Sequence, residues 1–140
     1  MNDLFNIIKE EGDELSWIYK DFNCFIKRNH LKAWCGYVKI PKELPLNFDF
    51  KSDDYFPLIC HGGITFQSSN DELFNVVGFD CAHSGDLIPK MLEFDSTHGD
   101  RNTYKDKDFV ISETNSIVDQ IIEFKEVKRH LKIKNLLKDI

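Results

Sequence analysis

Apolar residues recur along this chain with different periods, and each period predicts a different element. Four apolar residues at helical spacing within the first ten predict a short amphipathic helix that stops near Gly12. Residues 22–27 and 33–40 are typical of two strands, and the connection between them has the length of a hairpin. Pro41 ends the second strand because proline cannot donate a hydrogen bond to a sheet ladder.

The middle of the chain holds short apolar runs between polar and glycine-containing segments. Residues 42–57 have no clear period and predict a structured loop. Residues 58–61 and 64–67 are short strand candidates on either side of a glycine pair. Residues 74–81 are almost continuously apolar, which predicts a strand at the centre of a sheet.

A helical pattern closes the chain. Residues 87–94 predict a short helix, followed by a polar loop over 95–102. An apolar stripe then predicts a long helix that Thr103 can cap, which should reach at least Phe124 and whose continuation to Lys138 stays open. The prediction is one α+β domain over residues 1–140, with a small antiparallel sheet packed against the long C-terminal helix and a short N-terminal helix.

Composition narrows the class of protein. The chain has 140 residues, of which 41% are hydrophobic and 13% aromatic, so it can bury a core and is not a disordered tail. No run of about 18 apolar residues is present, so no membrane span is predicted. The N-terminus lacks the pattern of a signal peptide, so we expect a cytoplasmic protein whose four cysteines stay reduced.

Charge is unevenly distributed. Against a net charge of −6, residues 43–113 carry a net −9 and residues 125–140 a net +4. The overall acidity argues against direct nucleic-acid binding, and the basic end suits the C-terminal part of a helix. The acidity therefore belongs to the region that holds the candidate chemistry.

That chemistry lies in two segments, 60–65 and 78–86, each of which places a histidine close to glycine at the end of an apolar strand. If the two strands are neighbours, the polar side chains share one cleft. Strand alternation puts Cys81 and His83 on one face and Asp80 on the other, as far as the extended geometry persists. The candidate ligand-binding residues are Tyr37, His61, Gly62, Gly63, Thr65, Asp80, Cys81, His83 and Asp86.

Four interpretations of these residues stay open. They could bind a polar ligand through glycine amides and charged side chains. They could catalyse a reaction, with His61, Asp80 and His83 as the acid–base residues and Cys81 as a nucleophile. They could hold zinc, although their spacing matches no standard motif, so no cofactor is predicted. They could also serve only to hydrogen-bond turn amides.

The same segments resemble a family of small proteins in phage and prophage genomes. The resemblance covers roughly residues 22–122 and departs from the family pattern at Ile64, Phe109 and Ile121. The motifs are Trp34-Cys35-Gly36-Tyr37-Val38 with Pro41, His61-Gly62-Gly63-Ile64-Thr65, Gly78 to Asp86, and a final set of Tyr104, Phe109-Val110, Glu113 and Gln120-Ile121.

The resemblance implies a protein of viral origin that acts inside a bacterial cell. We therefore expect a phage accessory protein that counters host defence, for example as an anti-CRISPR, by binding a protein complex or a nucleotide-like ligand. Pairing of the C-terminal helix would give a homo-oligomer. The alternative is a small hydrolase or transferase that uses the histidine and aspartate residues.

Overall fold

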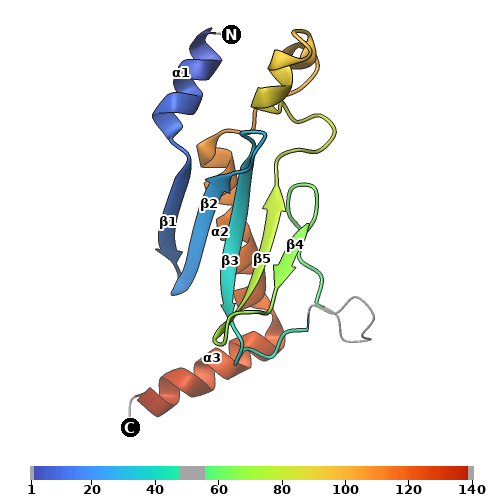
Figure 1. Cartoon of the computed structure of the whole chain (residues 1–140). Helices are drawn as coiled ribbons and strands as arrows, with labels where there is room; N and C mark the ends of the chain where they lie inside the picture. The colour runs from blue at the N-terminus through green and yellow to red at the C-terminus, as the bar shows by residue number, and fades with distance from the viewer. Residues whose placement is uncertain (1, 48–55, 139–140) are drawn as a thin grey trace.

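The computed structural model describes residues 2–47 and 56–138, and these residues form an antiparallel sheet with one helix packed along one face (Figure 1). The sheet has five strands in the order β1-β2-β3-β5-β4. The strands are β1 (Glu14–Tyr19), β2 (Phe22–Arg28), β3 (Trp34–Pro41), β4 (Phe66–Ser68) and β5 (Phe74–Asp80). The helices are α1 (Asn2–Glu11), α2 (Lys107–Glu123) and α3 (Lys125–Lys138), and two 3-10 helices, η1 (Pro89–Glu93) and η2 (His98–Asp100), follow β5.

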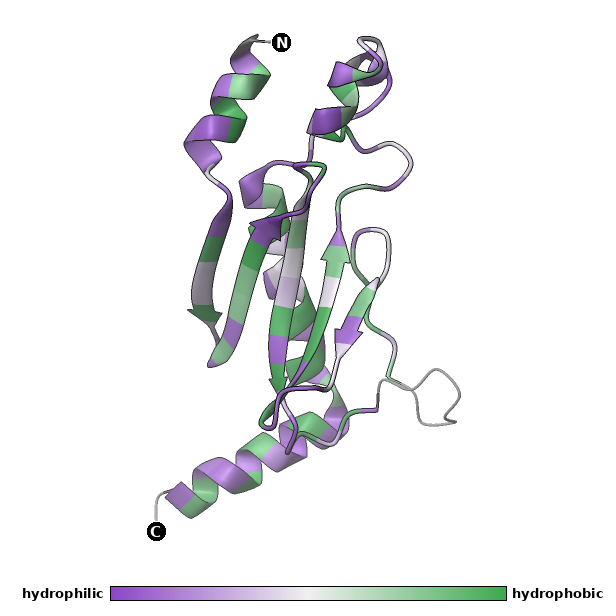
Figure 2. Cartoon of the chain, in the orientation of Figure 1, coloured by the Kyte–Doolittle hydropathy of each residue, from purple (hydrophilic) through white to green (hydrophobic). Residues whose placement is uncertain are grey.

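This arrangement confirms the predicted α+β fold, including the N-terminal helix, the β2–β3 hairpin and the inner strand β5. The core lies between the sheet and α2, where alternate strand residues meet the buried face of the helix (Figure 2). Gly36 of β3 is essential to this packing, because a Cβ atom there would lie 2.3 Å from Oγ1 of the buried Thr114. Glycine thus allows α2 to approach the middle of the sheet closely.

Two strand predictions need correction. Residues 58–61 are not a strand, because their backbone pairs with side chains of α2, and the 64–67 candidate is reduced to β4, which begins at Phe66. Sequence reasoning also missed β1, which occupies a sheet edge and has little apolar alternation. Its inward side chains Trp17 and Tyr19 hydrogen-bond Asn115 and Asp119 of α2.

The predicted C-terminal helix is also corrected. Asp106, not Thr103, caps α2 by accepting a hydrogen bond from the Phe109 amide, while Thr103 pairs with the backbone around Asp86. The helix ends at Glu123 because Phe124 turns to extended geometry and packs its ring 4.4 Å from that of Phe56. The basic segment continues as a separate helix, α3, which leaves in a new direction (Figure 1).

Other expectations hold in altered form. The short helix predicted over 87–94 is the 3-10 helix η1, and Pro89 is at its start. Residues 48–55 of the predicted 42–57 loop lie outside the described residues, and the rest of that loop contains no strand or helix. Within the described residues, no helix has both the length and the hydrophobicity that crossing a membrane requires.

Candidate functional site

The two glycine-containing segments meet beside the end of β5 and the first turns of α2. The ring centroids of His61 and His83 are 6.0 Å apart, and the His61 ring also meets Phe109 of α2 edge-on at 5.4 Å. Thr65, Asp80 and Asp86 contribute polar atoms to the same cluster. The fold therefore brings together the polar residues that the sequence placed in one site, and we call this group the histidine–aspartate cluster.

Asp86 is the buried centre of the cluster, with 2% of its surface exposed. Its carboxylate oxygens lie 2.8 and 2.9 Å from His61 Nε2, and Oδ2 accepts a hydrogen bond of 3.0 Å from the His83 amide. The Lys105 ammonium is 3.4 Å from Oδ1. Burial by itself would raise the pKa of Asp86, but the hydrogen bonds from His61 and the His83 amide outweigh it and hold that pKa below its usual range.

Asp80 organises the other side of the cluster. Its Oδ2 accepts a hydrogen bond of 2.8 Å from the Thr65 hydroxyl, and its Oδ1 accepts one of 3.0 Å from the Ala82 amide. His83 Nε2 lies 3.2 Å from Asp80 Oδ1 without the angle of a hydrogen bond, so this buried nitrogen has no hydrogen-bond partner among the described residues. The strand alternation that would separate Asp80 from His83 does not extend as far as His83, because β5 ends at Asp80 and the chain turns.

Gly62 is required for the two segments to meet. Its φ is +69°, in the left-handed region that disfavours other residues. A Cβ atom there would lie 2.2 Å from the His83 ring. The glycine in this motif therefore serves both the turn and the close approach of the histidine.

Two α2 residues that sequence reasoning did not assign to the site hold the 59–61 segment in place. Glu113 accepts a hydrogen bond of 2.7 Å from the His61 amide. The Gln120 carboxamide accepts from the Ile59 amide at 2.8 Å and donates to the Ile59 carbonyl at 2.7 Å, as a neighbouring strand would. Their spacing of seven residues places them on one face of a helix, and that spacing is the pattern in the sequence that could have indicated a shared role.

The thiols of Cys60 and Cys81 and the Tyr37 side chain do not join this polar network. Cys81 is buried in the core, and burial raises its pKa well above the usual range. Burial and the Glu113 charge raise the pKa of Cys60 to about 11. Both thiols are therefore protonated at neutral pH and poor nucleophiles. Tyr37 stacks on Phe25 on the sheet face that α2 does not cover.

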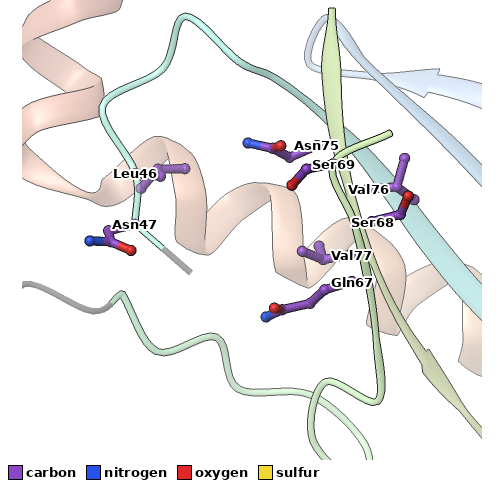
Figure 3. A pocket seen from close by; sticks show the side chains of 8 residues that line it. All are labelled: Leu46, Asn47, Gln67, Ser68, Ser69, Asn75, Val76 and Val77. Carbon is purple, nitrogen blue, oxygen red and sulfur yellow. The ribbon is translucent and has the colours of Figure 1, made fainter. Parts of the chain in front are cut away.

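A separate cavity of about 380 Å³ lies where β4 and β5 face residues 46–47. Figure 3 shows the side chains of Gln67, Ser69 and Asn75, from β4, β5 and the connection between them, directed toward Leu46 and Asn47. None of the residues predicted for the site lines this cavity. The histidine–aspartate cluster is thus a packed network and not part of this cavity.

Neither a metal-binding group nor a match to a known protein identifies what this cluster does. Among residues 2–47 and 56–138, no group of three or more His, Cys, Asp or Glu side chains is placed to hold a metal ion. The arrangement can hold two backbone segments rigidly and offer partly exposed imidazoles beside carboxylates. No protein-family model, curated protein or solved structure matches this chain.

Proposed function

We propose that this chain is a binding protein and not an enzyme. The observation that carries the proposal is the use of its polar side chains. The Asp86 and Asp80 carboxylates accept hydrogen bonds that join residues 61–65 to residues 80–86, and others that fix the turn within residues 80–86. Both carboxylates are therefore occupied in fixing these loops, which favours a binding surface over an active site built on them. Rigid loops at a strand end are a common basis for recognition.

The biological setting of the proposal follows from the motif resemblance. We infer a phage-encoded accessory protein that counters a host defence by binding a protein complex or a nucleotide-like ligand. The cluster and its two glycines would shape the binding loops, with His61, Gly62, Gly63, Thr65, Asp80, His83 and Asp86 in that role.

A plating assay tests this function. The chain is expressed in one strain with a CRISPR nuclease and in another whose defence uses a nucleotide signal, and each is challenged with phage. Wild type should raise plating efficiency in one strain, and His61→Ala should lose the effect while His30→Ala, at an exposed turn outside the cluster, keeps it. Unchanged plating in both strains, or consumption of the signal nucleotide by the purified protein, contradicts the proposal.

One observation favours the alternative of a His/Asp-dependent hydrolase. Asp86 orients His61 through Nε2, while His61 Nδ1 makes no hydrogen bond within the described residues. A carboxylate that orients a histidine with one ring nitrogen free is the arrangement of a general base. Nucleotide hydrolysis that His61→Ala abolishes, without a fall in melting temperature, would establish this alternative.

We further propose that the chain forms a homo-oligomer through α3. Ile133, Leu136 and Leu137 are 51%, 60% and 65% exposed on this helix. Pairing two such helices would remove these side chains from water. Leu136→Glu should therefore convert an oligomer to a monomer in analytical ultracentrifugation, whereas a monomeric wild type contradicts the proposal.

A further inference from the structure

The sheet face opposite α2 carries a row of aromatic side chains. Register pairs Phe25 of β2 with Tyr37 of β3, Tyr37 with Gly78 of β5, and Gly78 with Phe66 of β4. The Phe25 and Tyr37 rings stack with centroids 4.7 Å apart, and Phe66 meets Tyr37 edge-on at 5.4 Å. Two cations accompany the row, since Lys27 lies 5.4 Å from the Tyr37 ring and Lys39 lies 5.9 Å from the Phe25 ring.

An open hollow of about 520 Å³ lies beside this row, over strands β1 and β2. Its origin is the strand alternation: Trp17 and Cys24, which are paired in register, point into the core and leave only backbone at the outer surface. The register pairs on either side point outward and form the walls. The lining side chains that face outward are Ser16, Ile18, Asn23, Phe25 and Lys39.

The lining combines four kinds of chemistry. Phe25 offers an aromatic ring, and Ile18 is 70% exposed next to it. Asn23 and Ser16 offer hydrogen-bonding groups, and Lys39 a positive charge. Within the described residues, the side chains of Asn23, Ser16 and Lys39 make no hydrogen bond or ion pair, so their polar groups are available to a ligand.

We propose that this hollow binds the base and phosphate of a free nucleotide, at a site that contains no residue of the histidine–aspartate cluster. The proposal rests on the nucleotide-binding form of the proposed function only for the class of ligand. The base stacks against Phe25, because every nucleobase has a π face that an aromatic side chain can cover. The Asn23 carboxamide pairs with the donor and acceptor atoms of the base edge. Lys39 contacts the phosphate.

The charges on this face favour a single nucleotide over a nucleic-acid strand. Glu14 is paired in register with Lys27, and Asp80 with Cys35, so carboxylates flank the aromatic row. The whole chain carries a net charge of −6. Proteins that bind single strands instead follow the backbone with a continuous positive groove. One lysine in the hollow is enough to pair with one phosphate, but it does not offset the surrounding negative charge that would repel a chain of phosphates.

Isothermal titration calorimetry with AMP, adenosine and an oligothymidylate tests the site. Phe25→Leu keeps an apolar side chain and should raise the AMP dissociation constant about tenfold or more, the loss of one stacking contact. Lys39→Gln should weaken the binding of AMP and leave the binding of adenosine unchanged, because adenosine has no phosphate. Phe66→Leu and Lys27→Gln are matched controls on the same face outside the hollow and should bind AMP as wild type does.

Several results would overturn the inference. They are failure of wild type to bind AMP, equal losses in the control variants, and tighter binding of the oligothymidylate than of AMP. Melting temperatures identify a variant that fails to fold, and the exposed Asn23→Ala then replaces Phe25→Leu. If AMP binds wild type and Phe25→Leu, Lys39→Gln and Asn23→Ala equally, the hollow is not the binding site and this inference is overturned, while the nucleotide-binding form of the proposed function stands. If AMP does not bind but the chain still raises plating efficiency, the protein-binding form of the proposed function stands.

Discussion

Replacing Glu11 by Gln tests the network that ties α1 to the rest of the fold. The Glu11 carboxylate accepts hydrogen bonds from the Tyr104 hydroxyl, from the Lys107 amide at the start of α2, and from Arg28 at 3.1 Å. The Arg28 side chain is only 2% exposed and stacks 4.1 Å above the Trp34 ring. Gln has the same shape but no charge, so one of its polar atoms becomes a donor that faces other donors.

The expected cost follows from the burial of Arg28. Removing one partner of a buried ion pair costs about 3–5 kcal/mol, because the remaining charge stays desolvated. Asp13 cannot take over the pairing with Arg28, because its Oδ1 lies 3.7 Å from Arg28 Nε and its side chain is 74% exposed. The carbonyl oxygen of Gln keeps part of the hydrogen bonding, which places Glu11→Gln near 3 kcal/mol. For a domain of this size that loss lowers the melting temperature by roughly 10 °C.

Urea and thermal unfolding followed by circular dichroism measure this loss. Glu43→Gln is the control: it removes an ion pair of 2.6 Å with Lys134 whose side chains are about half exposed, and should leave the free energy of unfolding almost unchanged, because solvent screens such a pair. Adding Arg28→Met to Glu11→Gln should recover part of the loss, because no unpaired charge remains buried. A cost below about 1 kcal/mol for Glu11→Gln would refute this account of the network.

Three further predictions concern the histidine–aspartate cluster and the neighbouring thiol of Cys60. Gly62→Ala should cost about 2 kcal/mol or more in urea unfolding, whereas Gly63→Ala, with φ +80° and no atom within 4 Å of the added Cβ, should cost about 1 kcal/mol from backbone strain alone; equal losses would contradict the clash with His83. Because the pKa of Asp86 is lowered in the folded state, its stabilisation is present above the unfolded pKa of about 3.9 and is lost as pH falls through the folded value. Asp86→Asn should therefore show a shallower decline of unfolding free energy below about pH 4 than wild type does, and parallel acid profiles would exclude that contribution. Cys60, whose pKa is raised to about 11, should react with iodoacetamide at pH 8 more slowly than free cysteine, and mass spectrometry that finds rapid modification of the native protein would count against the raised pKa.

The residues of the candidate site were recoverable from the sequence, but their partners were not. Glycines close to His61 and His83 marked the ends of apolar runs, and both segments do converge. No local pattern identified Asp86 as the buried acceptor, and the spacing of Glu113 and Gln120 did not reveal that Glu113 would bind the His61 amide across 52 residues of chain. Such contacts depend on which faces of distant elements pack together.

Local periodicity by itself determined the N-terminal helix, the β2–β3 hairpin, the inner strand β5 and the amphipathic α2, because neighbouring residues set those patterns. Tertiary structure alone decided the rest. It placed β1 at the sheet edge, ended α2 where Phe124 packs on Phe56, and joined Glu11 to Lys107 across 96 residues. These features depend on burial and on hydrogen bonds between distant segments, and their free energy exists only once the chain has folded.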